Sequence, residues 1–466
     1  MALNEAPIAI IGGGITGLAA AHALRKHLPA DQIVLVERSN RLGGKIQTEH
    51  TGGFVIEEGP DSFLTTKPGA LELCRELGLS GQLVPTLPAT HRSYVRRHGR
   101  LFELPEGISG LIPSRLAPLL SSPLLSLRGR ARVALDLVRP AREGNAEESI
   151  ADFVRRRLGR EAYDWLVEPL LSGIYAGDGT QLSLDATFPQ LHDIERTRGS
   201  LIRGTLRQPR QPAAARSPFL APREGMDSIV RALESHLAGC TLTCGRTAIS
   251  VDAADDAYVI TFADGAMLQA RAVLLATPAF LSARLVAGLD AELGERLRGF
   301  PFVSTTTVAL GYPDTALPQK LRGYGYLRPR AEGGPIVACT WVSSKWPGRA
   351  PEGQTLLRAF VGRAGYEEAI DLTDDDLLGL VREELREVLG IVEPPTMTRI
   401  HRWPLSMPQY TLGHGYRLAR TEERVAMHPG LAIAGHSYHG IGIPDCIRSG
   451  QRAARQLMES ESAIPA

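Results

Sequence analysis

The stretch IAIIGGGITGLAAAHALRKHLPADQIVLVER, residues 8–38, decides the fold of this chain. Its first four residues form a short apolar run of the buried type, and a glycine-rich turn follows at 12–17. Apolar residues between 18 and 24 recur at helical spacing, and 33–36 is a second run rich in β-forming residues. The pattern predicts a strand, a tight turn, a helix and a second strand. This order is the usual opening of a parallel sheet that binds a dinucleotide at its carboxyl edge.

The glycine turn GGGITG has the spacing G-x-G-x-x-G, which lets the backbone approach a pyrophosphate at a helix N-terminus. The motif alone is weak, but here it follows a predicted strand, opens a predicted helix, and is followed by Glu37 at the end of the second strand. A carboxylate at that position can accept hydrogen bonds from a ribose diol. The nucleotide contacts that we expect in this region are Gly12, Gly13, Gly14, Ile15, Thr16, Gly17, Glu37 and Arg38.

Length and composition exclude several classes of protein. The 466 residues are too many for one ordinary core and suggest two or three domains. The net charge of +1 gives no general case for nucleic-acid binding, and no apolar run reaches the roughly 20 residues of a transmembrane segment. The first predicted strand begins within a few residues of the start, which leaves no room for a leader peptide. We therefore expect a cytoplasmic protein.

The five cysteines are not expected to form a disulfide framework, because their number is odd and only Cys240 and Cys244 lie close together. This use of cysteine fits a reducing compartment. The close pair has no further Cys or His at the spacing of a zinc site, so we expect no metal there.

Two segments are rich in arginine. Residues 91–142 contain ten Arg against three acidic residues, and we expect an amphipathic helical domain with a basic surface. Residues 196–223 contain seven Arg and no acidic residue, and we expect a basic loop. Two interpretations stay open for both segments. They are a solvated face balanced by acids elsewhere, or a surface that attracts an anionic substrate, a membrane surface or an acidic partner.

Later parts of the chain also carry local patterns. Residues 258–277 predict a hairpin followed by a buried strand, with the hairpin turn at Asp264-Gly265. A strand is expected at 304–312, a helix at 374–389 and a last short strand at 431–435.

Three segments resemble the FAD fingerprint shared by monoamine oxidases, phytoene desaturases and protoporphyrinogen oxidases. They are ERSNRLGG at 37–44, EEGPDSF at 57–63 and AGHSYHGIGIPDCI at 434–447. The resemblance implies an FAD-dependent oxidoreductase. Further positions that match the cofactor contacts of this family are Lys45, Gly59, Pro60, Asp61, Ser62, Ala248, Trp403, Ile441, Gly442 and Ile443. Ala248 departs from the Val that is common in the family, but a backbone contact to adenine tolerates the change.

Other segments narrow the resemblance to the porphyrinogen oxidases of the Gram-positive bacterial type. These segments are GGKIQT at 43–48, LLSGIYAGD at 170–178 and CTWVSSKWP at 339–347, and the similarity covers essentially the whole chain. The resemblance implies a six-electron oxidation of coproporphyrinogen III to coproporphyrin III in haem biosynthesis, with O2 giving H2O2. Protoporphyrinogen IX is the alternative substrate.

The same resemblance implies substrate contacts and partners. Lys67 matches a family position with Lys or Arg at the pocket mouth, and Ile174 matches a residue that packs on the macrocycle. A solvated lysine and an ordinary core isoleucine are the alternative interpretations. Four propionates favour a site with several cations, which the arginine-rich segments could provide. Contact with the next haem-pathway enzyme, ferrochelatase, and peripheral contact with a membrane stay open.

Two rival functions belong to other classes. Many amine oxidases have a lysine near the flavin on the strand that matches 303–312, but this strand has none, and no Cys stands where some of them tether FAD. We therefore expect noncovalent FAD. A non-catalytic FAD-binding or assembly protein is the other class, which flavin reduction by a porphyrinogen would exclude. We assign no catalytic acid or base, because structural roles explain His436 and His439 more simply.

Flavin motifs at both ends of the chain predict a discontinuous architecture. The fold class is α/β, with a Rossmann-like FAD-binding domain, a mixed-sheet substrate domain and a helical domain, like the monoamine oxidases and protoporphyrinogen oxidases. The predicted segments are 1–75, 220–295 and 395–466 for the FAD-binding domain, 76–180 for the helical domain, and 181–219 with 296–394 for the substrate domain.

Overall fold

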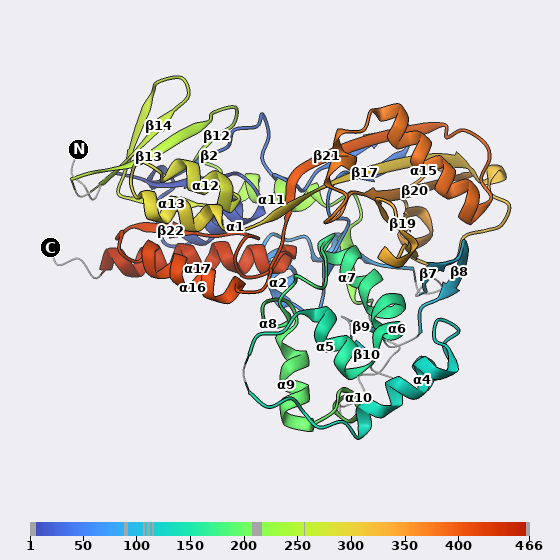
Figure 1. Ribbon diagram of the computed structural model, residues 1–466. Helices are drawn as coiled ribbons and strands as arrows, with labels where there is room; N and C mark the ends of the chain where they lie inside the picture. Colours follow the sequence, from blue (N-terminus) through green and yellow to red (C-terminus); the bar gives the residue numbers. More distant parts are fainter. Residues whose placement is uncertain are drawn as a thin grey trace.

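The structure, a computed structural model, has three lobes (Figure 1). One lobe contains both ends of the chain and a parallel sheet, a second contains a mixed sheet, and the third is mainly helical. The structure describes residues 6–87, 92–105, 108–109, 112–113, 116–144, 146–206, 217–255 and 257–462.

The parallel sheet has five strands in the order β12-β2-β1-β16-β22, and all neighbouring strands run parallel. These strands are β1 (Ile8–Ile11), β2 (Ile33–Val36), β12 (Thr241–Thr243), β16 (Ala272–Leu275) and β22 (Leu431–Ile433). The strands β1, β2 and β16 are entirely buried, which explains why they are continuous apolar runs rather than alternating ones.

Helices cover both faces of this sheet. Side chains from α1 (Ile15–Arg25), α11 (Asp227–His236) and α17 (Ile443–Ser462) share one core with Ile8 and Ile10 of β1. The other face packs against α12 (Ala279–Leu285), α13 (Ala291–Arg298) and the small sheet β13-β14-β15. That small sheet consists of β13 (Ala248–Ala254), β14 (Ala257–Phe262) and β15 (Met267–Ala270).

The second lobe contains a seven-stranded sheet in the order β21-β17-β20-β19-β18-β7-β8. Its strands are β7 (Ser93–Arg97), β8 (Arg100–Glu103), β17 (Phe302–Pro313), β18 (Gly325–Leu327), β19 (Ile336–Trp341), β20 (Gln354–Val361) and β21 (Met397–Pro408). The amphipathic helix α15 (Asp374–Leu389) buries Leu377, Val381 and Leu385 against this sheet.

The helical lobe has a core of its own and a buried ionic centre. Its main helices are α4 (Leu127–Ala134), α5 (Ile150–Arg157), α7 (Glu168–Tyr175), α9 (Pro189–Arg198) and α10 (Leu201–Leu206). The guanidinium of Arg157 is fully buried, and its Nε donates to Asp136 Oδ1 over 2.6 Å. The Arg157 Nη1 atom lies 3.2 Å from Glu195 Oε1, so the buried positive charge has two carboxylate partners.

The local patterns of the sequence were good guides to single elements. The predicted β1, α1, β2, the hairpin turn at Asp264-Gly265, β17 and α15 are all present. The expectation that 91–142 belongs to a helical domain is wrong for its first part, because 93–103 forms β7 and β8. The strand β7 pairs with β18 on one side and with β8 on the other, so this piece lies in the mixed sheet.

The division into domains stays a prediction. Strands of the parallel sheet come from all three segments that we assigned to the FAD-binding domain. The strand β21 lies in the third of these segments, yet it pairs along its length with β17 of the mixed sheet. Among the described residues, none of the helices combines the length and the apolarity that crossing a membrane requires.

Candidate functional site

The glycine turn lies where β1 ends and α1 begins, and the space around each of its glycines differs. A Cβ on Gly17 would lie 2.0 Å from Gly12 O, and one on Gly12 would lie 2.8 Å from Ala276 O. A Cβ on Gly14 would meet no protein atom within 4 Å, and Gly14 caps α1 without a side-chain hydrogen bond. Gly12 and Gly17 therefore pack the turn, whereas Gly14 leaves open space at a helix N-terminus, where a phosphate fits.

Glu37 follows β2 and reaches across this turn. Its Oε2 accepts from the Gly13 N–H over 2.8 Å, and its Oε1 accepts from the backbone N–H and the hydroxyl of Ser39, both over 2.8 Å. A carboxylate has about four acceptor sites, so these contacts leave capacity for a ribose hydroxyl. The neighbouring Arg38 is exposed. Ala248 begins β13, and the loop before it contacts the same place, because the Arg246 N–H donates to Glu37 O over 3.0 Å.

The second glycine turn lies directly against the first. The Gly43 N–H donates to Gly13 O over 2.8 Å, and a Cβ on Gly44 would lie 3.1 Å from the Gly14 Cα. Arg41 braces this turn from within, since its guanidinium donates to the carbonyls of Leu42 and Gly44. Arg41 is therefore used to shape the loop.

Lys45 turns inward from the second glycine turn. Its Nζ donates to Ser406 O and lies 2.7 Å from His436 Nε2. Burial lowers the pKa of Lys45 to about 8. Burial, together with the neighbouring Lys45 charge, holds the pKa of His436 well below its usual range. This pair joins the N-terminal motif to the C-terminal one and provides a cation in a poorly solvated place.

The segment 57–63 is held by basic side chains that the sequence analysis did not single out. Asp61 accepts from Lys345 Nζ over 2.9 Å and lies 3.8 Å from the Arg358 guanidinium. Burial alone would raise the pKa of Asp61, but the charges of Lys345 and Arg358 hold it well below its usual range. Ser62 donates to Asp61 Oδ1 over 2.7 Å. The carboxylate that we matched to a cofactor contact is therefore engaged by protein groups.

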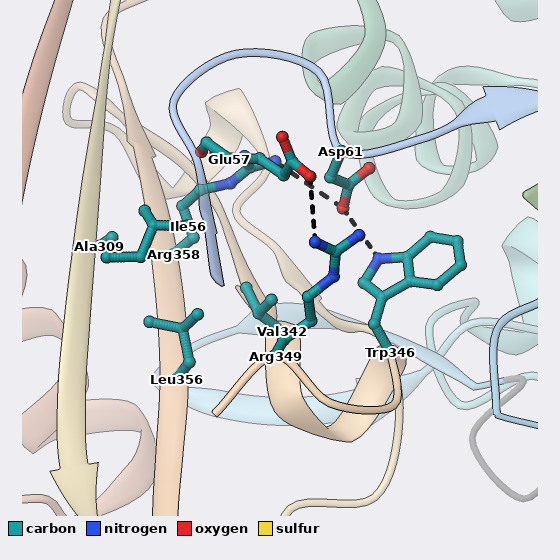
Figure 2. A pocket seen from close by; sticks show the side chains of 9 residues that line it. All are labelled: Ile56, Glu57, Asp61, Ala309, Val342, Trp346, Arg349, Leu356 and Arg358. Carbon is teal, nitrogen blue, oxygen red and sulfur yellow. Dashed lines mark hydrogen bonds and ion pairs between the residues drawn. The ribbon is translucent and has the colours of Figure 1, made fainter. Parts of the chain in front are cut away.

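Figure 2 shows this cluster at a narrow pocket, where Glu57 and Asp61 face Arg349, Trp346 and Arg358. Glu57 Oε1 lies 3.2 Å from Arg349 Nη1. Lys345 and Trp346 belong to CTWVSSKWP, and Arg358 lies in β20 shortly after it. An Arg within an apolar strand was the one signal in the sequence that could have pointed to a buried ionic partner.

Side chains of the mixed sheet also fix the backbone of this segment. Arg358 Nη1 donates to Glu57 O over 2.7 Å and to Gly59 O over 2.9 Å. The indole N–H of Trp403, on β21, donates to Glu58 O over 3.0 Å. A Cβ on Gly59 would lie 2.0 Å from Lys45 O, so Gly59 and the adjoining Pro60 pass close against the second glycine turn.

The C-terminal motif forms the loop between β22 and α17. Gly450 of α17 packs on α1, because a Cβ there would lie 2.2 Å from Thr16 O. This contact sets the N-terminus of α17 beside the first glycine turn. Ile441 packs on the core of the helical lobe, and Ile443 is buried at the start of α17. Cys446, three residues after Ile443, is buried, and burial raises the pKa of its thiol to about 11.

The two predicted substrate contacts lie near this loop. Lys67 Nζ donates to Asp445 Oδ2, in the first turn of α17, over 2.6 Å, and its side chain remains 43% exposed. Ile174 is on α7 and is 39% exposed, which excludes the core interpretation. Lys67 has a protein partner in this structure, so it is not a free surface lysine.

Most arginines of the segment 91–142 that the structure describes are bound by protein acceptors. Arg97 Nη1 donates to Leu124 O over 2.9 Å and stacks on Trp165. Arg130 donates to Ser122 O over 3.0 Å, and Arg132 donates to Arg156 O over 2.7 Å. These arginines hold the helical lobe together. The basic loop predicted at 196–223 is wrong for most of its described residues, because α9 extends to Arg198, α10 spans Leu201–Leu206 and β11 spans Phe219–Pro222; residues 207–216 lie outside the described residues.

One group of acidic residues could be mistaken for a metal site. Ligand atoms of Glu49, Glu58 and His401 lie within 4.8 Å of one another. Arg399 Nε, however, lies 2.8 and 2.9 Å from the two oxygens of Glu49, and His401 Nδ1 lies 3.1 Å from Glu58 Oε2. Arg399 thus balances the charge of Glu49, and His401 is a hydrogen-bonding neighbour of Glu58.

Comparison with known proteins identifies the type of site. A family model described as flavin-containing amine oxidoreductase matches residues 15–458. Coproporphyrinogen III oxidase of Bacillus subtilis (strain 168) is 40% identical over 97% of both chains, and chloroplastic protoporphyrinogen oxidase of Nicotiana tabacum is 29% identical over 97% of this chain and 85% of its own. The crystal structure of a candidate protoporphyrinogen oxidase from Exiguobacterium sp. 255-15 is 33% identical, with a TM-score of 0.87 over 98% of this chain and 99% of its own. The predicted fold and the flavin-dependent oxidoreductase class are confirmed.

The different surroundings of Gly14 and Gly17 give a test of the site. Gly14→Ala should leave stability nearly unchanged, because its Cβ meets open space and its φ of −71° suits alanine. It should weaken flavin binding by about tenfold or more, because a methyl group blocks the close backbone approach, and tenfold corresponds to about 1.4 kcal/mol. Fluorescence titration of the apoprotein with FAD measures this affinity.

Gly17→Ala is the control, since its Cβ would collide with Gly12 O at 2.0 Å. We expect it to lower the unfolding midpoint through about 1–3 kcal/mol of overpacking. A folded Gly14→Ala protein with the affinity of the wild type would contradict our placement of the phosphates.

Proposed function

We propose that this chain, which belongs to the flavin-containing amine oxidoreductase family, binds FAD noncovalently and oxidises coproporphyrinogen III to coproporphyrin III in haem biosynthesis. The observation that carries the proposal is its higher identity to coproporphyrinogen III oxidases than to the plant protoporphyrinogen oxidases, over nearly its whole length. The alternative substrate is protoporphyrinogen IX, which the names of the plant relatives favour.

Features of the site support an FAD. Open space at Gly14 suits the pyrophosphate, Glu37 suits the ribose, and the buried cation of Lys45 lies between the two terminal motifs. Noncovalent binding is supported by the residues 436–439, which contain no Cys where some amine oxidases tether FAD, whereas Cys446 lies later, within α17. When bound, FAD supplies the two-electron acceptor that removes hydride from the porphyrinogen.

The overall reaction balances with O2 as the oxidant. Coproporphyrinogen III loses six hydrogen atoms in three two-electron steps, and three O2 become three H2O2. The residues of the chain bind and orient the substrate. Because Ile174 is an exposed apolar residue of α7, it is suited to pack on a macrocycle, while Lys67 offers a cation to a propionate.

We place this activity in the cytoplasm, which agrees with five free cysteines. Contact with ferrochelatase and peripheral contact with a membrane stay predictions.

Substrate choice is the direct test of the proposal. Purified protein should release free FAD on acid precipitation, and kcat/KM should be higher for coproporphyrinogen III than for protoporphyrinogen IX. Steady-state porphyrin fluorescence measures both rates. A higher kcat/KM for protoporphyrinogen IX would overturn the assignment of the substrate. Flavin that stays in the acid pellet would show a covalent link.

Lys67→Ala tests the proposed cation at the pocket. We expect KM for coproporphyrinogen III to rise several-fold at low salt, with a smaller effect on kcat, because an ion pair with a bound propionate is lost. Added salt should reduce the difference if water reaches the site.

Lys26→Ala is a matched control, because Lys26 is 45% exposed and pairs with Glu76 over 2.7 Å, whereas Lys67 is 43% exposed and pairs over 2.6 Å. Lys67→Arg should keep most of the affinity. An unchanged KM in Lys67→Ala would show that Lys67 serves only to pair with Asp445.

A further inference from the structure

The loop from Gly435 to Gly442 contains no helix or strand that would fix its backbone. It connects β22 to α17 and contains the residues matched to flavin contacts. Gly435 and Gly440 have φ values of +129° and +122°, a region that side chains disfavour. A loop with such glycines keeps one shape only if other parts of the molecule hold its backbone.

Tyr410 holds both ends of this loop through one hydroxyl. Its hydroxyl donates to His436 O over 2.7 Å and accepts from the Gly440 N–H over 2.7 Å. The side chain is almost completely buried. One phenol thus satisfies a carbonyl and an amide four residues apart.

His414 holds the middle of the loop. Its ring stacks on Tyr410 with centroids 4.1 Å apart, and its Nε2 lies 2.9 Å from Tyr438 O. A carbonyl oxygen only accepts, so Nε2 carries the hydrogen of this bond. Burial lowers the pKa of His414, which keeps the ring neutral. Nδ1 has no hydrogen-bond partner among the described residues.

The segment that contains Tyr410 is also attached to the helical lobe. Tyr410 O accepts from the Ser183 N–H over 2.8 Å, and the Leu412 N–H donates to Gln181 O over 2.8 Å. Gln409 Nε2 donates to Tyr175 O, beside Ile174, over 2.8 Å. One short segment therefore fixes the loop after β22 relative to the lobe that presents Ile174.

We propose that Tyr410 and His414 are positioning residues. They set the conformation in which the loop 436–442 faces FAD, and they fix the position of this loop relative to the helical lobe. This inference rests on the proposed function, because it takes FAD as the group beside the loop. The hydroxyl of Tyr410 has the larger share of this role, since it makes two of the three hydrogen bonds between these two residues and the loop.

The test compares Tyr410→Phe with Tyr258→Phe. Tyr258 is a matched control, because it is also buried and its hydroxyl donates over 2.7 Å to a backbone oxygen, that of Pro429, outside the loop. Tyr410→Phe should raise the Kd of FAD roughly tenfold, as expected for two lost hydrogen bonds, and should change the visible absorption spectrum of the bound flavin. Tyr258→Phe should change neither.

His414→Phe keeps a ring on Tyr410 and removes the bond to Tyr438 O, so it should give a smaller rise in Kd with a spectral change of the same kind. This variant provides the test if Tyr410→Phe does not fold. Wild-type protein that binds FAD, with either variant matching Tyr258→Phe in Kd and spectrum, would overturn the positioning role alone. Wild-type protein that takes up no FAD would overturn the proposed function and the positioning role together.

Discussion

The parallel pairing of β1 with β2 on one side and β16 on the other is the interaction on which the rest of the structure depends. Because β16 also pairs with β22, one sheet joins the start, the middle and the end of the chain. Parallel strands end at the same edge, so the glycine turn after β1, Glu37 after β2 and the loop after β22 meet there. The contact of Gly450 with Thr16 then brings α17 against α1.

Buried charge fixes the segment that joins this edge to the mixed sheet. Asp61 and Glu57 would be expensive to bury alone, and Lys345, Arg349 and Arg358 compensate them from the second lobe. Such pairs add little net stability over apolar side chains of similar size. Their consequence here is geometric, because the pairs tie the segment 57–63 to β20 and to the segment before it.

The residues that we propose as substrate contacts also come from separate lobes. Ile174 comes from the helical lobe, Lys67 precedes α2 (Pro68–Glu76), and Asp445 belongs to α17. Segment 409–412 links these parts through backbone bonds to the helical lobe and through Tyr410 to the loop after β22. A macrocycle held between lobes would thus contact residues from distant parts of the sequence.

The sequence by itself determined the β1-α1-β2 unit, the hairpin at Asp264-Gly265 and the helix α15, since local periodicity and glycine spacing carry this information. The flavin family followed from the resemblance of the segments 37–44, 57–63 and 434–447 to a known fingerprint. It did not reveal that 93–103 joins the mixed sheet, because β7 pairs there with β18, a strand more than 200 residues later in the chain. Nor could it show that Asp61 is engaged by Lys345, 284 residues away, or that the Tyr410 hydroxyl holds the loop after β22. Tertiary structure decided these contacts, because the bonds of a buried polar group depend on which distant groups are folded around it.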